Sequence, residues 1–409
     1  MPKRPVKQLG IGDIKIGALE KKFVNQVLSS NRLSYGPFSQ KFEREFAKLH
    51  TRKYAILTNS GTSALQVGLH ALKSIYKWKD GDEVLVPAVT FIATSNVVIQ
   101  NRLKPVFVDI DPDYFSIDPE QIEKHITKNT RAIIPVHLFG QSVDMEKILR
   151  TAKRHNLKIL EDSAQAMFVK YRGKPVGSQG DIACFSTYAT HLITTGVGGI
   201  AATNDDEIAV KMKSLFNHGR DGIYLKIDDD AQVTGAKLFE IVDKRFSFVD
   251  VGYSYRATEL EAAIGLAQLR KWKQIIKKRQ QNAAYLVKGL SDLQEYIQLP
   301  KIRPGSEHAF MLFPILVFTP KISRDKQSLF LRDKLVFFLE DNLIETRYLF
   351  PLLNQPVYKK IFGNLEKNYT VAANLNKNGF IIGCHPGLTR NDLDWIIWVF
   401  HTFFKKHAK

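Results

Sequence analysis

Short β-rich runs that alternate with helical patterns constrain the fold of the first 270 or so residues more than any other feature. Each run is mostly apolar, as is typical of strands buried on both faces of a parallel sheet. The runs lie at residues 54–58, 82–87, 104–109, 131–136, 157–162 and 200–203. This alternation predicts an α/β fold in which helices cover both faces of a largely parallel sheet.

The pattern changes near residue 270. A helix begins at Thr258 and continues through the charged residues 271–279, which we interpret as the link to a second unit. We therefore predict a large three-layer αβα domain over residues 1–270 and a smaller α+β domain over residues 271–409, and a chain of 409 residues has room for both. The expected strands and final helix of the smaller domain lie at residues 309–318, 344–348 and 391–404.

Composition limits the classes of function. The chain is 44% hydrophobic and 24% charged, as is typical of a soluble globular protein. Its two cysteines, Cys184 and Cys384, exclude a four-thiolate iron–sulfur cluster and a Cys-rich zinc site, and we expect no metal centre. The apolar runs fall short of the ~20 residues that span a bilayer, and no apolar leader follows Met1. We expect a cytoplasmic protein without a membrane contact.

The net charge of +18 suits an anionic ligand, such as a phosphorylated small molecule. The lysines and arginines are scattered, and their longest clusters are pairs and triplets such as residues 277–279. A nucleic-acid interface gathers such residues on one face. We therefore expect no nucleic-acid partner.

Two stretches at predicted strand ends carry chemistry. Ser60 to Ser63 join a strand to a helix, where backbone N–H groups bind a phosphate; a simple helix N-cap is the alternative. Asp162 ends a buried strand, at the edge where open α/β sheets bind ligands. A carboxylate there needs a cationic partner, such as the protonated ring nitrogen of pyridoxal phosphate. Magnesium ligation and a helix cap are the other roles open to Asp162.

Taken together, these and further motifs resemble one family, the DegT-type nucleotide-sugar aminotransferases, which are fold-type I pyridoxal-phosphate enzymes. The resemblance covers nearly the whole chain. It rests, in order, on residues 60–62, 90–94, 106–111, 137–140, 161–166, 185–186, 217–220, 252–260 and 384–388.

The resemblance implies which residues bind pyridoxal or pyridoxamine 5'-phosphate. The implied contacts are Gly61, Thr62 and Ser186 to the phosphate, Phe91 stacked on the ring, Asp162 at the ring nitrogen and Gln165 near the 3-hydroxyl. Ser254 stands where the family usually has Asn, which reaches the phosphate of the neighbouring subunit. The family works as a homodimer with shared sites, and we expect the same here. Arg220 and Arg256 are candidates to bind a sugar diphosphate or a glutamate carboxylate, since arginine forms bidentate contacts with anions; surface ion pairs are the alternative.

One departure from the family decides the chemistry. The lysine that links covalently to the cofactor lies five residues after the serine of the Phe-Ser motif, and here that position is His191. No lysine lies between Lys174 and Lys211. An imidazole forms no imine with the cofactor but still acts as a base, with an ordinary pKa near ~6.5. We therefore expect a non-covalently held cofactor. Lys174, in a predicted hairpin, is the first candidate for a substitute lysine.

The same exchange marks the 3-dehydratases of this family. By resemblance, the pyridoxamine form would condense with a nucleotide-linked 4-keto-6-deoxyhexose, His191 would move the proton, and the C3 hydroxyl would leave. Hydrolysis would release ammonia, and L-glutamate would restore the amine. A transamination without the usual lysine and a catalytically silent, ligand-binding homologue are the alternatives. Two further departures are Leu192, where these dehydratases tend to have a second histidine, and Val197, where the family has a carboxylate.

Overall fold

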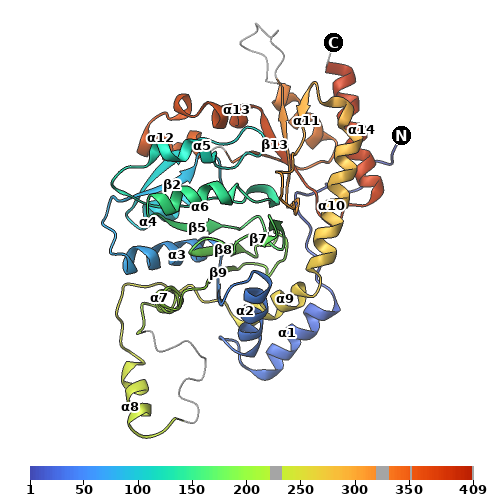
Figure 1. Cartoon of the computed structure of the whole chain (residues 1–409). Helices are drawn as coiled ribbons and strands as arrows, with labels where there is room; N and C mark the ends of the chain where they lie inside the picture. The colour runs from blue at the N-terminus through green and yellow to red at the C-terminus, as the bar shows by residue number, and fades with distance from the viewer. Residues whose placement is uncertain (222–232, 319–330, 351, 408–409) are drawn as a thin grey trace.

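The computed structural model describes residues 1–221, 233–318, 331–350 and 352–407. Seven strands of this part form the main sheet, in the order β1-β9-β8-β5-β4-β2-β3 (Figure 1). β9 runs antiparallel to both its neighbours, and the other pairings are parallel. The strands are β1 (Tyr54–Thr58), β2 (Glu83–Pro87), β3 (Lys104–Val108), β4 (Thr130–Ile133), β5 (Lys158–Asp162), β8 (Ile182–Ser186) and β9 (Gly199–Thr203). The largely parallel sheet that we predicted is confirmed.

Helices cover both faces of this sheet, because successive side chains of each strand point to opposite faces. Val84 and Val86 pack in one core with α3 residues, whereas Leu85 packs in another core with α6 residues. The α-helices before residue 250 are α1 (Ala18–Ser30), α2 (Pro37–Leu49), α3 (Gly61–Ile75), α4 (Ala93–Gln100), α5 (Pro119–Ile122), α6 (Met145–Arg154), α7 (Asp206–Phe216) and α8 (Gly235–Lys244). The fold is therefore the three-layer arrangement of fold-type I enzymes.

A second, antiparallel sheet is built from β10 (Ile297–Gln298), β11 (Phe313–Val317), β13 (Gly379–Ile382) and β12 (Thr346–Tyr348), in that order. Leu9, near the N-terminus, bridges to Ile344 and joins the core of this sheet. The helices around it are α10 (Trp272–Gly289), α11 (Leu331–Asp341), α12 (Pro356–Phe362), α13 (Thr370–Asn378) and α14 (Arg390–His407). The strands and the final helix that we predicted in the last third of the chain are confirmed; the division at residue 270 stays a prediction.

The single long helix that we predicted from Thr258 is wrong. The structure has α9 (Glu259–Leu269) and then α10, with a turn at Arg270 and Lys271. The turn brings Nζ of Lys271 to 2.6 Å from the buried carboxylate of Glu20, and Trp272 stacks on Phe168 with the ring centroids 5.0 Å apart. Both contacts are long-range, so the local helical pattern does not reveal the break.

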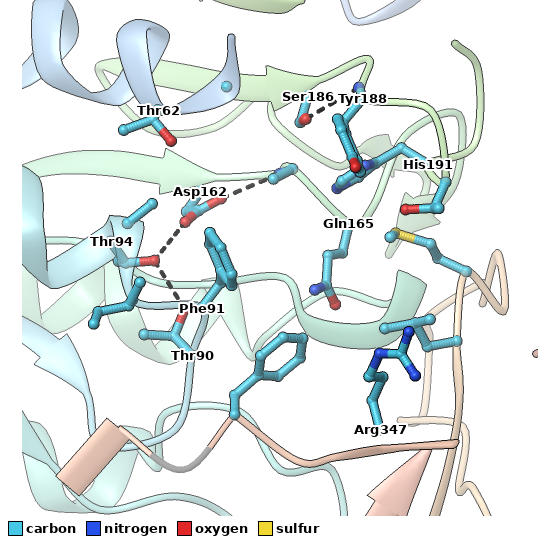
Figure 2. Close-up of a pocket in the computed structure, with 18 of the residues that line it drawn as sticks. Thr62, Thr90, Phe91, Thr94, Asp162, Gln165, Ser186, Tyr188, His191 and Arg347 are labelled. Atoms are coloured by element: carbon cyan, nitrogen blue, oxygen red, sulfur yellow. Dashed lines mark hydrogen bonds between the residues drawn. The ribbon is translucent and has the colours of Figure 1, made fainter. Parts of the chain in front are cut away.

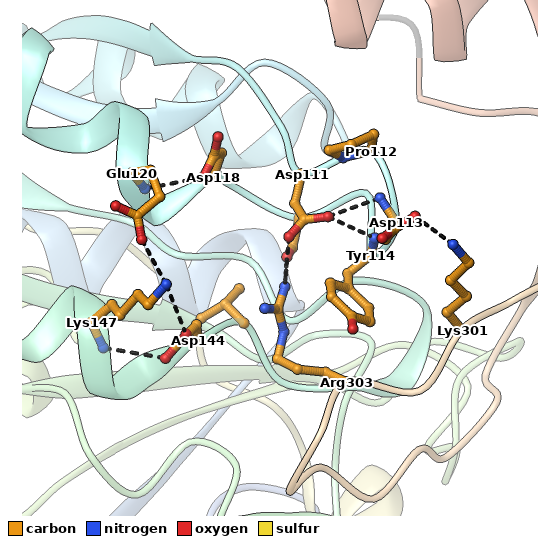
Figure 3. Close-up of polar contacts among 12 residues, drawn as sticks. Asp111, Pro112, Asp113, Tyr114, Asp118, Glu120, Asp144, Lys147, Lys301 and Arg303 are labelled. Atoms are coloured by element: carbon orange, nitrogen blue, oxygen red, sulfur yellow. Dashed lines mark hydrogen bonds and ion pairs between the residues drawn. The ribbon is translucent and has the colours of Figure 1, made fainter.

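Charged side chains tie the loop after β3 to the segment between β10 and β11 of the second sheet (Figure 3). Lys301 Nζ lies 2.6 Å from Asp113, and the Arg303 guanidinium lies 3.6 Å from Asp111 and over the ring of Tyr114. Asp109, at the end of β3, accepts hydrogen bonds from the first backbone N–H groups of α13. The two sheets are therefore joined by polar contacts as well as by chain connections. In the part of the chain that the structure describes, no helix is long and apolar enough to cross a membrane.

A buried histidine makes the stability depend on pH. His50 is fully buried and stacks on Phe46, and burial lowers its pKa to about 4. The unfolded chain protonates this group near pH ~6.5, so the free energy of unfolding falls as the pH drops from about 6.5 toward 4, by about 3 kcal/mol for a fully buried histidine. In a His50→Phe variant this part of the pH dependence should vanish, as measured by urea unfolding at several pH values. An unchanged slope would contradict this assignment.

Candidate active site

A cavity of about 780 Å³ opens where the carboxyl ends of β5 and β8 meet the start of α3 (Figure 2). Open α/β sheets bind their ligands at this edge. Residues from the second sheet, among them Arg347 and Tyr348, and from the N-terminal segment, Ile11 and Gly12, complete its wall. Seven of the predicted site residues line it: Gly61, Thr62, Phe91, Asp162, Gln165, Ser186 and His191.

The start of α3 forms the anion-binding end of the cavity. Ser60 is the N-cap, and its Oγ accepts a hydrogen bond from the N–H of Ser63 at 3.0 Å, so the cap that we considered is present. The N-terminus of α3 carries no acidic side chain in its first turn, and Gly61 and Thr62 line the cavity beside Ser186. A Cβ on Gly61 would lie only 2.8 Å from the Cβ of Ser186. Glycine therefore lets the serine approach a helix terminus that attracts phosphate.

Asp162 is the buried acid of the cavity. Its Oδ2 accepts a hydrogen bond from Thr94 at 2.8 Å, and Thr94 lies 2.8 Å from the Oγ1 of Thr90. Burial raises the pKa of Asp162, and the hydrogen bonds from Thr94 and from the N–H of Ala164 oppose this effect. A protonated ring nitrogen would supply the missing positive charge. The described residues contain no group of three or more His, Cys, Asp or Glu arranged to hold a metal ion.

A second carboxylate, Glu161, lies directly behind Asp162 and is fully buried. Its carboxylate accepts hydrogen bonds from His137 Nε2 at 3.0 Å and Arg52 Nη2 at 3.2 Å. It also accepts hydrogen bonds from backbone N–H groups of residues 177–180. Burial alone would raise the pKa of Glu161, but these partners lower it to about 2. His137 is therefore a hydrogen-bonded packing residue. This network fixes the end of β5 and hence the backbone of Asp162.

Phe91 and Gln165 face the middle of the cavity (Figure 2). Phe91 is 58% exposed although it lies beside the buried Thr90, and Phe350 meets it edge to face. A ring face remains available for stacking on a flat cofactor. Gln165 Oε1 accepts a hydrogen bond from the N–H of Phe139 at 2.8 Å, which leaves its amide N–H groups as donors to the cavity.

His191 lies on the wall opposite Asp162, where its ring meets that of Tyr188 edge to face (Figure 2). Its Nδ1 is buried without a hydrogen-bond partner among the described residues. Burial lowers the pKa of His191 to about 4, below the ordinary value that we expected, so the imidazole is neutral at physiological pH. None of the described residues that line the cavity is a lysine. Lys174 lies in the predicted hairpin, β6 (Lys170–Tyr171) and β7 (Lys174–Pro175), away from this wall.

Three predicted residues do not line the cavity of this chain. Ser254 and Arg256 are exposed and lie near His218, with Arg256 Nη2 3.4 Å from Ser254 Oγ. The guanidinium of Arg220 lies over the rings of Phe246 and Phe248.

The sequence analysis missed three features of the site. Thr94 lies in a family motif, but the sequence analysis assigned it no role. It also assigned no role to Arg347, Ile11 or Gly12, because these three residues reach the cavity through long-range packing. The sequence pattern placed Arg347 only in a predicted strand of the second sheet, and this position by itself indicates no role in the site.

The comparisons with known proteins agree with this geometry. A model of the DegT/DnrJ/EryC1/StrS aminotransferase family matches residues 15–400. The chain belongs to this family. It is therefore an enzyme that depends on pyridoxal phosphate, in its aldehyde (PLP) or amine (PMP) form, and the helix terminus, buried carboxylate and exposed ring fit that group.

Relatives in this family differ in the reactions that their names state. A GDP-perosamine synthase from Caulobacter vibrioides is 33% identical over 392 residues, 95% of this chain and 96% of that protein. A dTDP-4-dehydro-2,6-dideoxy-D-glucose 3-dehydratase from Saccharopolyspora spinosa is 33% identical over 391 residues, 92% of this chain and 82% of that protein. The structure of E. coli GDP-4-keto-6-deoxy-D-mannose-3-dehydratase with bound hydrated PLP superposes with a TM-score of 0.84 at 28% identity, over 97% of this chain and 100% of that one.

Neutralising Asp162 should weaken the binding of PLP without lowering the stability of the protein. Asp162→Asn removes a buried carboxylate, so the free energy of unfolding should stay the same or rise, while the affinity for PLP should fall at least about tenfold. Equilibrium dialysis and urea unfolding measure the two quantities. Asp113→Asn, in the contact with Lys301, is the control and should leave PLP binding unchanged. Equal PLP affinity in Asp162→Asn and the wild type would contradict the assigned role.

Proposed function

We propose that this enzyme removes the C3 hydroxyl of a nucleotide-linked 4-keto-6-deoxyhexose in the cytoplasm, with PMP held non-covalently, His191 as the base and L-glutamate as the amino donor. One observation carries the proposal: the wall at the position of the family's lysine presents a neutral histidine, and none of the described lining residues is a lysine. Two of the relatives named above are sugar 3-dehydratases.

The proposed reaction balances without an external reductant. The C–O bond at C3 breaks and a C–H bond forms there, which consumes two electrons. Glutamate supplies them as it is oxidised to 2-oxoglutarate with release of ammonia. The water formed from the hydroxyl offsets the water used in hydrolysis. When bound, the cofactor supplies the amine that condenses with the ketone and an electron sink.

The residues of this chain bind and orient the cofactor, transfer the proton and exclude water. The start of α3 and Ser186 bind the phosphate, and Phe91 and Asp162 fix the plane and the charge of the ring. His191 accepts a proton at its accessible face because it is neutral, and returns it later in the cycle. Residues such as Met311, Leu312 and Phe350 give the cavity apolar walls that exclude water.

Transamination is the second candidate, and the GDP-perosamine synthase relative favours it. Its product would carry an amine at C4 and retain the C3 oxygen. Because the donor half-reaction is common to both candidates, they differ only in the sugar half-reaction, through the sugar product and the release of ammonia.

We also propose that the enzyme works as a homodimer. Ser254 and Arg256 are exposed beside apolar residues that are also exposed, among them Phe246, Val249 and Val251 at 81%, 58% and 85%. Helix α8 projects from the body at the same end of the molecule (Figure 1). A second copy that covers this surface would bring Ser254 to the neighbouring cavity, as the family resemblance implies, and we propose that Arg256 and Arg220 reach it in the same way.

The sugar product tests the proposal directly. The protein is mixed with PLP, glutamate and a 4-keto-6-deoxyhexose nucleotide, and the products are examined by mass spectrometry together with an ammonia assay. We expect a sugar nucleotide that has lost one oxygen and an equal amount of ammonia. A product whose carbonyl has become an amine would establish transamination, and no turnover with any such sugar would favour a silent homologue.

His191 should control the rate without controlling binding. We expect His191→Asn to lower the rate of dehydration at least about 100-fold, since general bases contribute ~10²–10⁴, while PMP affinity stays within about threefold. In the wild type, kcat/KM should decline on the acid side only as the pH approaches the pKa of His191, about 4, because the protonated ring accepts no proton. Full activity of His191→Asn would contradict the assignment.

A further inference from the structure

Arg347 is the one permanently cationic side chain among the described residues that line the cavity. It belongs to β12, in the second sheet, and its side chain is 60% exposed. Figure 2 shows its guanidinium pointing into the cavity, on the same side as Gln165 and His191. Neither the proposed cofactor contacts nor the proposed base gives this charge a role.

The guanidinium of Arg347 forms an ion pair with a carboxylate of this chain, that of Glu345. Its Nη2 donates to Oε1 of Glu345, and its Nη1 donates to the carbonyl of Thr346 at 2.7 Å. The other oxygen of Glu345 accepts a hydrogen bond from the N–H of Ile11 at 2.8 Å. Glu345 itself lines the cavity, so this pair faces the ligand space. Arginine binds carboxylates through a fork of parallel N–H groups, and the pair shows that Arg347 is placed for such a contact.

We propose that Arg347 binds a carboxylate of the amino donor, and that Glu345 occupies the guanidinium when the donor is absent. The inference rests on the proposed use of glutamate. The α-carboxylate of an amino acid is attached to its reacting carbon, so its binding group has to lie beside the base. The diphosphate of a nucleotide sugar is separated from C4 by the hexose ring. Arg347 and His191 line the same cavity, on the side where Gln165 lies (Figure 2), so the position of Arg347 suits the carboxylate better than the diphosphate.

The role that we propose for Glu345 follows from the fact that the site has to accept two ligands in turn. The donor and the sugar react at the same place, so the site has to release 2-oxoglutarate before the sugar enters. A cation left unpaired in a partly apolar cavity would retain a carboxylate strongly. Glu345 competes for the guanidinium and so promotes release of 2-oxoglutarate. Its contact with Ile11 also keeps the N-terminal segment against the cavity wall.

The two half-reactions are measured separately. In the first, the PLP-loaded protein receives glutamate, and the absorbance change from aldehyde to amine is followed. We expect Arg347→Gln to lower kcat/KM for glutamate about 100-fold, mainly through KM, and Arg347→Lys to recover part of it. In the second, the protein is loaded with PMP and given the sugar nucleotide; here Arg347→Gln should stay within about threefold of wild type. Arg150→Gln is the control, since Arg150 is also 60% exposed and paired with a glutamate.

A binding measurement keeps the inference independent of turnover. Glutarate carries two carboxylates and no amine, and calorimetry reports its affinity for the PLP-loaded protein. We expect Arg347→Gln to weaken glutarate binding at least about tenfold and Glu345→Gln to strengthen it, because the competing carboxylate is gone while an amide oxygen can still accept from Ile11.

The possible outcomes are distinct. Unchanged glutarate affinity in Arg347→Gln, or a loss confined to the sugar half-reaction, overturns the inference and assigns Arg347 to the sugar nucleotide. If the wild-type protein never reacts with glutamate, the proposed donor is wrong, and the glutarate measurement still decides whether Arg347 is a carboxylate site.

Discussion

Two consecutive carboxylates at the end of one buried strand organise this molecule. Glu161 points into the protein, where Arg52, His137 and three backbone N–H groups satisfy it. Asp162 points into the cavity, where Thr94 and one backbone N–H are its hydrogen-bond donors. Because strand neighbours face opposite sides, the same short segment anchors the loop at 177–180 and presents a negative charge to the ligand. The cofactor site depends on both halves of this arrangement.

The replacement of a lysine by His191 changes what the opposite wall can do. A lysine would hold the cofactor covalently; in the function that we propose, a neutral imidazole leaves it free and acts as the base. The surroundings favour the neutral form, since burial lowers the pKa of His191 to about 4. Binding would then depend on the helix terminus at Gly61, the stacking surface of Phe91 and the charge of Asp162. The second sheet adds Arg347, through which we propose that the site distinguishes its two substrates.

The sequence predicted what is encoded locally. The strands, the turn at the start of α3 and the candidate cofactor residues lie within short motifs, and six of those candidates, all but Ser254, line the cavity. The features that it missed depend on contacts between distant segments: the break before Trp272, the hydrogen bond from Thr94 to Asp162, and the approach of Arg347 and Ile11 to the cavity. The pKa of His191 was also out of reach, because it follows from burial. Ser254, Arg220 and Arg256 remain predictions, since they do not line the cavity of a single chain.

The central claim is that the cofactor is held without a covalent bond, and chemical trapping tests it most directly. The protein is incubated with one equivalent of PLP, reduced with borohydride and digested, and the peptides are examined by mass spectrometry. The account predicts no stoichiometric adduct in the wild type and an adduct at position 191 in His191→Lys, which serves as the positive control. A stoichiometric PLP adduct on any lysine of the wild-type protein would contradict it.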